Sequence, residues 1–596
     1  MNLTQHKEIK LRSSQLSIID DIHQSLRNNE DIAFEAPTGT GKTIAYLYAG
    51  FILAKEQKRK LIVSTSTNLL QDQIIKDIPK LEQLCKCRVN IALLKGKQHY
   101  MCLQKFSHNA SLHQTDLEKI NTELDSGWNL ERNNLKGVFS KKFINDVFYS
   151  FGCCIGSFCQ YADYCPAISK NQLGENADII VINHDLLLCE LMNDKSFIVR
   201  NSNDYIYVID EAHTFSSKAI AKTQCKLSLE ALLRNLIRLE SINGVDKMCA
   251  LKDVITHTRS NMSILLKDIT TIDENTALKS NLNKIHLLLA NKLKEMKSSQ
   301  LYIKAVESTN YLVLSQMKKL EDSLETLDVM LNNEIKCIWH DKDYIVTQEL
   351  TATRIMSTYV SPILKGKSVW CSATLTVNNS FNYFKHQVSN FSLSNTKRYK
   401  SSFDYSTVKL LIPKISSGPN ALIFDSLHNF LLDEEYNAKL YLFTSRKDML
   451  EAYSYIDDIN KKNIIIQDGV ESKEFMIQKH KDNIDSGNRS VIFGLQTFFE
   501  GVDLPGKYLN EVLIYKLPFE SNESPINRAL LKYNNRNLFA DKILPEAAIR
   551  LKQMCGRLLR SDKDYGRLII LDNRLINAKY SSYLLASIPE YVLSQF

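Results

Sequence analysis

Residues 31–54 read DIAFEAPTGTGKTIAYLYAGFILA, and this part of the sequence says most about the fold. The apolar run Asp31–Glu35 predicts a buried strand, and the apolar run Ile44–Ala54 predicts a helix. A Gly-rich segment, residues 36–43, separates them. A strand, a Gly-rich loop and a helix in this order form a phosphate loop, in which backbone N–H groups approach phosphates at the positive end of the helix.

The chemistry of this loop predicts a nucleotide triphosphate site. Gly39 and Gly41 allow close approach of the backbone, Lys42 should reach the β- and γ-phosphates, and the Thr43 hydroxyl should bind Mg²⁺. The expected nucleotide-binding residues of the loop are Ala36, Pro37, Thr38, Gly39, Thr40, Gly41, Lys42 and Thr43.

A second string, Asp210-Glu211-Ala212-His213, follows the apolar run Tyr205–Ile209. A carboxylate at the carboxyl end of a strand can hold a metal ion, and the next carboxylate can polarise the attacking water. We therefore expect Asp210 to bind Mg²⁺ and Glu211 to act as the general base. An isolated Asp-Glu pair is usually a solvated turn, but a phosphate loop upstream favours the catalytic interpretation, and the two strings together predict an ATPase.

Composition limits the class of protein. A chain of 596 residues exceeds one hydrophobic core, so roughly three or four domains are expected. The net charge of +8 is compatible with a polyanionic partner. The N-terminus has no apolar core of a signal peptide, and Ile44–Ala54 is too short to span a bilayer. Thirteen cysteines in such a chain indicate a reducing compartment. We expect a cytoplasmic protein that does not engage a membrane.

Short Ile- and Val-rich runs separated by long connections predict parallel strands buried on both faces. They form two sets, and two sets predict two α/β lobes; one large doubly wound domain is the alternative. The first set comprises Asp31–Glu35, Lys60–Thr67, Asp178–Asn183, Tyr205–Ile209 and Ser368–Cys371, and the second comprises Lys439–Thr444, Asn463–Gln467, Ser490–Phe493, Glu511–Tyr515 and Arg567–Leu571.

The stretch Val245–Ser361 contains neither Gly nor Pro. Within it, apolar residues recur every three or four positions, which is typical of helices with one buried face. We therefore expect a mostly helical insertion. The recurring residues are Leu278, Leu282, Ile285, Leu289 and Leu293, and then Met317, Leu320, Leu324, Leu327 and Leu331.

Cysteines gather between the phosphate loop and Asp210. Cys154, Cys159 and Cys165 have the spacing C-x4-C-x5-C, and Cys102 precedes them. Four thiolates suit zinc or an iron–sulfur cluster, although the paired C-x2-C elements of structural zinc are absent. Spacing alone leaves a cluster, zinc and free thiols open, and Cys153 is an alternative to Cys154 as a ligand.

Further strings resemble the motifs of superfamily 2 helicases. The resemblance lies in Ser64–Thr67 with Leu70–Gln73, Ser372–Leu375, Phe443–Ser445, Phe498–Asp503 (with Phe499 in place of the usual Trp) and Gln553–Arg560. It implies that Gln553, Arg557 and Arg560 act in catalysis and that Asp503 contacts the nucleotide. Arginines stabilise charge on transferred phosphate, and Arg557 and Arg560 share a helix face. Leu11–Gln15 resembles the family's R-x-x-Q element, in which Gln15 would recognise adenine.

The cysteine region narrows the resemblance. Gly96–Cys102, the spaced cysteines with Pro166, and the string A-D-x-x-x-x-N-H-x-L-L from Ala177 to Leu187 are similar to the bacterial DinG family, relatives of the XPD helicases. This similarity implies that Cys102, Cys154, Cys159 and Cys165 hold a 4Fe–4S cluster and that the helical insertion is an arch domain. It also implies 5′→3′ unwinding. Because only about 35 residues precede the phosphate loop, we expect this chain to differ from the relatives that carry a fused exonuclease domain.

The resemblance implies an α/β fold with two RecA-like motor domains and two insertions. The expected domains are residues 1–100, 173–215 and 346–380 for the first motor domain, 101–172 for the cluster domain, 216–345 for the arch and 381–596 for the second motor domain.

The expected function is an ATP- and Mg²⁺-dependent DNA helicase that acts on single-stranded, forked or hybrid nucleic acid in DNA repair or replication. We expect a monomer whose partners are a single-strand-binding protein or replication proteins. Two alternatives stay open: a CRISPR-associated DinG-like helicase, and an ATP-gated DNA clamp that hydrolyses ATP without separating strands.

Overall fold

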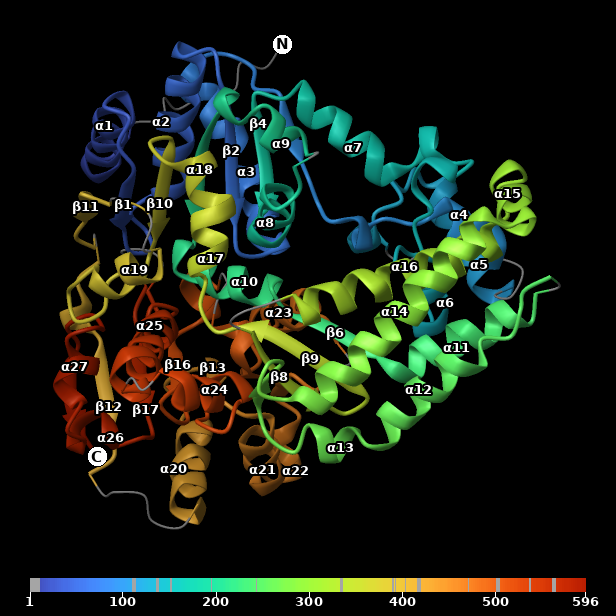
Figure 1. Cartoon of the computed structure of the whole chain (residues 1–596). Coiled ribbons are helices and arrows are strands. Elements are labelled where there is room, and N and C mark those ends of the chain that lie inside the picture. The colour runs from blue at the N-terminus through green and yellow to red at the C-terminus, as the bar shows by residue number, and fades with distance from the viewer. Residues whose placement is uncertain are drawn as a thin grey trace.

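The computed structural model describes residues 11–596, apart from residues 110–113, 136–138, 151–152, 195, 243, 333–335, 389–390, 392, 402, 415–419, 470, 500–503, 535–536 and 560–563. Within this part of the chain lie two seven-stranded sheets and one four-stranded sheet. Figure 1 shows both seven-stranded sheets on one side of the molecule, with the cysteine region and a long helical insertion projecting from the first of them.

The first sheet is parallel, with strand order β11-β1-β10-β5-β2-β4-β3. Its strands are short and completely buried at the centre, as their Ile- and Val-rich sequences predict. A separate apolar core covers each face. The strands are β1 (Ile32–Glu35), β2 (Lys60–Thr65), β3 (Ile91–Leu93), β4 (Ile179–Asn183), β5 (Tyr205–Asp210), β10 (Ser368–Ser372) and β11 (Asn395–Arg398).

Helices pack on both faces of this sheet. One face carries α1 (Ser13–Arg27), α2 (Lys42–Glu56) and α3 (Asn68–Cys85), and the other carries α8 (His184–Leu191), α10 (Phe215–Lys222), α18 (Ser361–Leu364) and α19 (Asn382–Gln387). Local sequence fixes the helix starts: the Thr67 hydroxyl, for example, accepts the backbone N–H of Leu70 and so caps α3.

The second sheet is also parallel, with strand order β14-β15-β13-β16-β17-β12-β18. It too has an apolar core on each face. The strands are β12 (Lys409–Ile412), β13 (Ala438–Leu442), β14 (Ile464–Ile466), β15 (Ser490–Gly494), β16 (Glu511–Ile514), β17 (Arg567–Ile570) and β18 (Val592–Gln595). Its principal helices are α20 (Asn420–Leu432), α21 (Arg446–Tyr455), α23 (Lys473–Asp485), α24 (Pro525–Asn534), α25 (Leu544–Cys555), α26 (Arg574–Asn577) and α27 (Ser581–Leu585).

Two parallel sheets, each with its own cores, confirm the predicted α/β class with two lobes. The single doubly wound domain is wrong. We call the unit around the first sheet lobe 1 and the unit around the second sheet lobe 2.

The insertion between β5 and β10 differs in part from the prediction. It contains the expected helices, α11 (Leu229–Glu240), α12 (Cys249–Ser260), α13 (Met262–Leu265), α14 (Thr276–Ser298), α15 (Gln300–Glu307) and α16 (Tyr311–Leu331), around one apolar core. It also contains an antiparallel sheet of β6 (Cys225–Ser228), β7 (Thr270–Thr271), β8 (Lys336–Asp341) and β9 (Tyr344–Glu349). The lack of Gly misled the prediction, because Lys342 adopts φ 56° in the β8–β9 turn, where glycine is usual.

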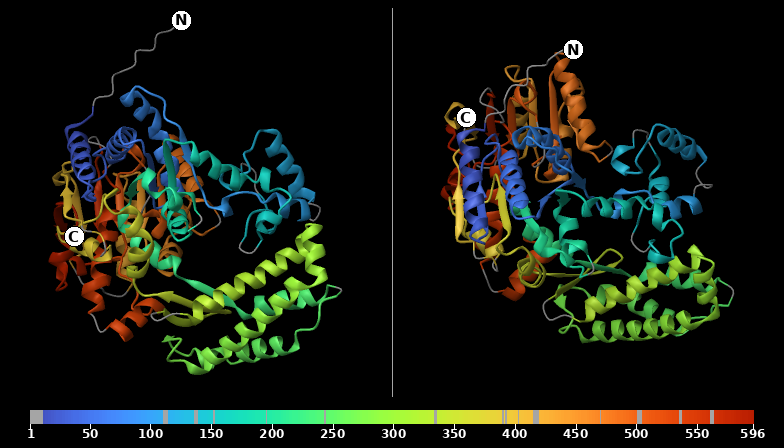
Figure 2. Two further views of the ribbon diagram at one scale, coloured as in Figure 1. Left: turned by 45° about the horizontal axis from the view of Figure 1, so that its top comes forward. Right: turned by 90° about the horizontal axis from the view of Figure 1, so that it is seen from above.

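The cysteine region lies between β3 and β4. It consists of α4 (Leu103–Asn109), α5 (Gln114–Asp125), α6 (Lys141–Val147), α7 (Pro166–Glu175) and short 3-10 turns around a small apolar core. Ile155 of this region packs into the core of the helical insertion, and the rings of His108 and Tyr311 lie 5.5 Å apart. Figure 2 shows the two insertions next to each other, away from the lobes. The exact domain boundaries stay predictions.

The helical insertion also contacts lobe 2. Trp339 and Val346 of its sheet pack with Ala529 of α24. Beside them, Glu274 accepts a hydrogen bond from Tyr533 Oη (2.6 Å) and pairs with Lys532 Nζ (3.4 Å). The insertion therefore bridges the cysteine region and lobe 2. In the described part of the chain, no helix is long and apolar enough to cross a membrane.

Candidate active site between the lobes

The topology brings three motif loops to one edge of the first sheet. Strands β1, β10 and β5 are neighbours and parallel, so their carboxyl ends meet. The phosphate loop follows β1, Ser372–Leu375 begins at the end of β10, and β5 ends at Asp210, directly before Glu211. This edge is where open α/β sheets bind their ligands.

The phosphate loop has the backbone that its glycines predict. Gly39 and Gly41 adopt φ 81° and 76°, and Lys42 begins α2. Two side chains from the start of α1 hold the loop: Arg12 Nη1 donates to Gly39 O (2.5 Å), and Gln15 Nε2 donates to Gly41 O (3.2 Å). Gln15 Oε1 also accepts from Arg12 N (2.8 Å), so both the oxygen and the nitrogen of the Gln15 amide already form hydrogen bonds with the backbone. Adenine recognition by Gln15 stays a prediction.

Lys42 points at the two predicted catalytic carboxylates. Its Nζ lies 2.9 Å from Asp210 Oδ1 and 3.7 Å from Glu211 Oε1. Asp210 is also held by Tyr46, whose hydroxyl donates to Oδ2 (3.2 Å), and by the Cys371 thiol, which donates to Oδ1 (3.5 Å). Glu211 adopts φ 54°, a left-handed conformation that is costly for a side chain with a Cβ and is typical of functional positions.

A chain of hydrogen bonds leads from Glu211 into lobe 2. Ser372 Oγ donates to Glu211 Oε2 (2.9 Å), and His213 Nδ1 lies 2.8 Å from Ser372 Oγ. Gln553 Nε2 of α25 lies 2.5 Å from His213 Nε2, so that Nε2 accepts and Nδ1 carries the proton. Gln553 also donates to Thr374 Oγ1 (3.4 Å). The general base predicted from the sequence is therefore oriented by residues of both lobes.

The charges of this cluster stabilise one another. Burial opposes ionisation of Glu211, but Lys42, the Ser372 hydroxyl and, when its ring is protonated, His213 outweigh it and lower its pKa to about 2. Burial likewise disfavours the Lys42 ammonium, yet Asp210 and Glu211 raise its pKa above the ordinary value. Glu211 is thus a permanent carboxylate and Lys42 a permanent cation at neutral pH.

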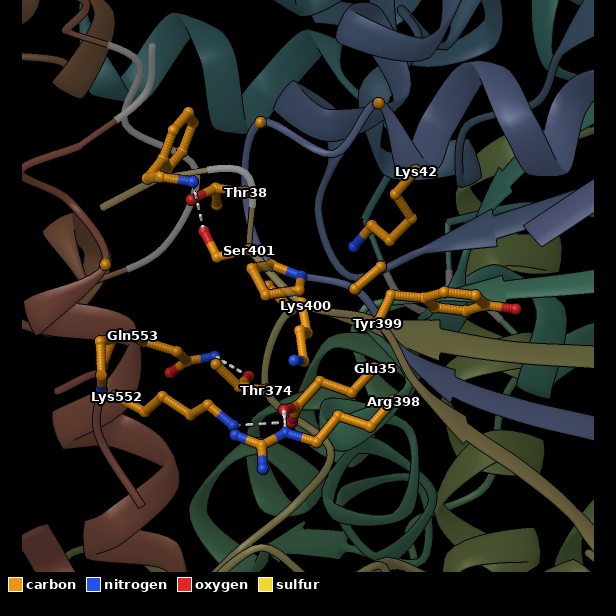
Figure 3. Close-up of a pocket in the computed structure, with 18 of the residues that line it drawn as sticks. Glu35, Thr38, Lys42, Thr374, Arg398, Tyr399, Lys400, Ser401, Lys552 and Gln553 are labelled. Atoms are coloured by element: carbon orange, nitrogen blue, oxygen red, sulfur yellow. Dashed lines mark hydrogen bonds and ion pairs between the residues drawn. The ribbon is translucent and has the colours of Figure 1, made fainter. Parts of the chain in front are cut away.

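Lobe 2 supplies two further cations. Arg557 lines the cavity between the lobes, and its charge is among those that lower the pKa of Glu211. Lys552 Nζ lies 2.7 Å from Glu35 Oε2, although Glu35 ends β1 in lobe 1. Glu35 is only 1% exposed and also accepts from Thr376 N (2.7 Å) and Arg398 Nε (3.2 Å). Figure 3 shows Lys552 and Gln553 reaching from one helix of lobe 2 towards Glu35, Arg398 and Thr374.

These groups line one cavity of ≈ 1410 Å³ between the lobes. Its walls include Gln15, Lys42, Asp210, Glu211, Gln553 and Arg557 and the loop residues Ala36, Pro37, Thr38, Gly39, Gly41 and Thr43. Thr40 lies behind them, buried, with its hydroxyl donating to Pro37 O (2.8 Å). The predicted residues Arg560 and Asp503 lie outside the described residues.

Three parts of this site escaped the sequence prediction. Glu35 and Lys552 carry no motif of their own, although each lies directly beside a motif. The sequence analysis assigns no role to the linker residues around Phe403. The one indication of a role for Glu35 and Lys552 in the sequence is their position, because each directly precedes a recognised motif.

The five cysteines near the predicted cluster site come from separate segments. Cys102 precedes α4, Cys153 and Cys154 follow α6, Cys159 lies between two 3-10 turns, and Cys165 precedes α7. A hydrogen bond from the Cys102 thiol lowers the pKa of Cys153 to about 6 and raises the pKa of Cys102. Burial raises the pKa of Cys159, and the nearby thiols of Cys153, Cys154 and Cys165 add to this.

These interactions place the five thiols near one another. Thiolates are soft donors, and four of them fit an iron–sulfur cluster. This set of residues contains none of the carboxylates that harder metal ions prefer. Among the described residues, no three or more His, Cys, Asp or Glu side chains are already arranged to hold a single metal ion.

Two family models match the chain. The DEAD/DEAH box helicase model matches residues 12–146, and the helicase C-terminal domain model matches residues 430–591. The ATP-dependent DNA helicase DinG of Photobacterium profundum is 27% identical over 94% of this chain and 91% of its own length. YoaA of Escherichia coli, also an ATP-dependent DNA helicase, is 26% identical over 97% and 94%. The 3′-5′ exonuclease DinG of Bacillus subtilis is 27% identical over 98% of this chain and 71% of its own length.

Solved structures share the fold. An XPD helicase superposes with a TM-score of 0.61 at 16% identity and covers 99% of this chain and 100% of its own. Xpd4 of S. tokodaii gives a TM-score of 0.58 at 15% identity over 98% and 100%. These likenesses confirm the predicted architecture.

Proposed function

We propose that the chain is a DinG-like superfamily 2 helicase, which hydrolyses ATP between its lobes to move along single-stranded DNA and separate duplex or hybrid strands. The observation that carries the proposal is the cavity to which both lobes contribute: Lys42, Asp210 and Glu211 from lobe 1, and Gln553 and Arg557 from lobe 2. A site divided in this way works only when the lobes are together, so hydrolysis is tied to their movement.

We assign the steps to residues as follows. The phosphate loop binds the triphosphate, and Lys42 exchanges its carboxylate partners for the β- and γ-phosphates. Thr43 and Asp210 would hold Mg²⁺, which supplies charge neutralisation when bound. Glu211, kept ionised by its surroundings and oriented by Ser372, accepts a proton from the attacking water.

The second lobe stabilises the charge that develops on the phosphate. Arg557 approaches the cavity from the turn after α25, and we assign to it this role, shared with Arg560. Gln553 holds His213 and, through it, Ser372 and Glu211. Closure of the lobes therefore completes the orientation of the general base, which is a direct route from lobe position to hydrolysis rate.

We further propose that Cys102, Cys154, Cys159 and Cys165 hold a 4Fe–4S cluster, with Cys153 as a fifth thiol beside them. The support is the gathering of five thiols described above. A bound cluster would cross-link segments that otherwise share only a small apolar core. Burial and four of these thiols raise the pKa of Tyr311 on α16, so the site borders the helical insertion.

Finer points also belong to the proposal: 5′→3′ movement, a monomeric and cytoplasmic protein, and a single-strand-binding or replication protein as partner. The wild-type protein should release a labelled strand from a duplex with a 5′ tail faster than from one with a 3′ tail, in the presence of ATP and Mg²⁺. Lys42→Ala is the control that should release neither.

Equal release from both tails would contradict the polarity. ATP hydrolysis stimulated by DNA with no strand release from either substrate would favour the clamp. Iron and acid-labile sulfide, measured per chain after anaerobic purification, test the cluster; zinc or no metal at these cysteines would refute it.

A further inference from the structure

The segment that links the lobes passes through the proposed ATP site. Residues Tyr399–Thr407 connect β11 of lobe 1 with β12 of lobe 2. The cavity is lined by Tyr399 and by six further residues of this linker: Lys400, Ser401, Phe403, Asp404, Tyr405 and Ser406. Figure 3 shows Lys400 and Ser401 of this linker between Lys42 and Gln553. A connection that only joined two domains would not need side chains in the site.

Phe403 is packed directly against the phosphate loop. A Cβ atom on Gly39 would lie only 1.9 Å from Phe403 Cζ, so the tip of the ring touches the glycine backbone. Phe403 is 8% exposed, although it belongs to the linker. Gly39 is therefore needed both for its positive φ and for the space that the ring takes.

The cavity offers both charged and apolar contacts. Lys42, Asp210, Glu211 and Arg557 provide the charges that a triphosphate and its metal ion require. Apolar and aromatic side chains also line it, beside further charged ones such as Arg398 and Lys400: Leu11, Phe403, Tyr405, Leu585, Ile588 and Pro589. A nucleotide needs both kinds of contact, because a charged triphosphate is joined to a flat apolar base.

Gln15 is a poor candidate for holding the base by itself, because its amide already bonds to Arg12 N and Gly41 O. An aromatic ring at the edge of the phosphate loop offers a stacking surface instead.

Aromatic contacts continue from Phe403 to the helix that carries Gln553. The Phe403 and Tyr405 ring centroids are 6.4 Å apart, and those of Tyr405 and Tyr591 are 5.5 Å apart, both in edge-to-face geometry. The Tyr591 hydroxyl donates to the carbonyl of Cys555, the last residue of α25 (3.2 Å). Each step is a packed contact, and the series ends two residues before Arg557.

We propose that Phe403 is the platform on which the nucleotide base stacks, and that Tyr405 and Tyr591 connect its position to α25. This inference rests on the proposed ATP site and adds the residue that binds the base. It makes the linker the part of the molecule that senses an occupied site, because movement of the ring bears on the helix that supplies Gln553 and Arg557.

Equilibrium binding without DNA tests the platform. Phe403→Ala should weaken ATP binding roughly 5- to 150-fold, the range for loss of one aromatic–base stack, and leave the affinity for inorganic tripolyphosphate unchanged. Phe403→Trp should retain ATP binding. Phe519→Ala is the matched control, because Phe519 packs on the same lobe core but does not line the cavity.

Three outcomes would overturn the platform: equal losses for ATP and tripolyphosphate, tighter tripolyphosphate binding by the alanine variant, or no change for either ligand. The connection to α25 has its own test. Tyr591→Phe removes one hydrogen bond and should lower kcat for ATP hydrolysis about fivefold with KM unchanged. An unchanged kcat would overturn it.

The two proposals fail separately. A protein that binds ATP through Phe403 yet releases no strand from a forked duplex contradicts the helicase proposal alone. A helicase whose Phe403→Ala variant binds ATP normally contradicts the platform alone.

Discussion

The buried ion pair between Glu35 and Lys552 should hold the lobes in register for hydrolysis. Glu35 ends the strand before the phosphate loop, and Lys552 precedes Gln553 on α25. Their side chains are 1% and 10% exposed, and Nζ and Oε2 lie 2.7 Å apart. We predict that Lys552→Met and Glu35→Gln each slow ATP turnover, and that the double variant is less impaired than the sum of the two.

The magnitudes follow from what each change leaves behind. Lys552→Met removes one charge-assisted hydrogen bond, about 1.5–3 kcal/mol, while Thr376 and Arg398 still hold Glu35. Glu35→Gln leaves the Lys552 cation buried beside Arg398 without a compensating carboxylate and with neutral acceptors only, such as Thr376 Oγ1 (3.2 Å) and Thr376 O (3.5 Å), a loss of about 3–5 kcal/mol. The double variant leaves neither charge buried without its partner, so the coupling energy between the two positions should be about 2 kcal/mol or more.

The assay is ATP turnover stimulated by single-stranded DNA in the wild type, both single variants and the double variant. A loss of 3 kcal/mol in lobe closure corresponds to roughly a 150-fold lower population of the closed arrangement. The exposed pair Arg27–Glu56, 54% and 48% exposed, gives the control cycle, with a coupling of at most about 1 kcal/mol. If the effects of Glu35→Gln and Lys552→Met add to within about 0.5 kcal/mol, the two side chains are not coupled and the ion pair does not hold the lobes in register.

Three further predictions concern the two sites. Lys42→Ala should reduce ATP hydrolysis at least about 100-fold, because the phosphates lose their main counter-charge, and near-normal turnover would refute the assignment. Burial opposes ionisation of Glu211, but the effects of Lys42, protonated His213 and the Ser372 hydroxyl are larger. The pKa of Glu211 in the folded protein is therefore about 2, below its ordinary value of 4.5. Its stabilising contribution is present above pH 4.5 and lost as pH falls towards 2, so wild type should lose stability relative to Glu211→Gln only in that window; a pH-independent difference in unfolding free energy would contradict this. Cys159→Ser should give a colourless protein with little iron, and Cys153→Ser should retain the visible absorption that Cys154→Ser loses; the reverse order would make Cys153 the ligand.

The parts of the site that the sequence predicted are those in which neighbours along the chain act together. Gly39, Gly41 and Lys42 work through one loop, so their spacing states their chemistry. The strands flanking the motifs were also predictable, because a strand buried on both faces must be apolar throughout. The edge strands β11 and β18 were missed for the converse reason: Asn395–Arg398 and Val592–Gln595 lie at sheet edges, where polar or exposed side chains are tolerated.

The contacts between the lobes were beyond sequence reasoning. Glu35 and Lys552 are 517 positions apart in the sequence, and the residues around each of them do not indicate that the two side chains meet. A lysine on a helix is usually solvated, so Lys552 suggested no partner until the fold placed α25 over β1. The contact of Phe403 with Gly39 could not be predicted either. An aromatic residue in a linker indicates that it packs against the protein, but not which glycine it packs against.

Two kinds of connection therefore join the lobes, and they differ in what they respond to. Glu35 and Lys552 form a charged contact between the end of β1 and α25, so it keeps α25 close to lobe 1. Gln553 and His213 form part of a chain that ends on Glu211, so this contact governs how the base is oriented. A small displacement of α25 would leave a long, flexible lysine in contact with Glu35, but the series through Gln553, His213 and Ser372 depends on hydrogen-bond geometry at each step. The ion pair can thus keep the lobes associated while the hydrogen bonds break, and hydrolysis can stop without separation of the lobes.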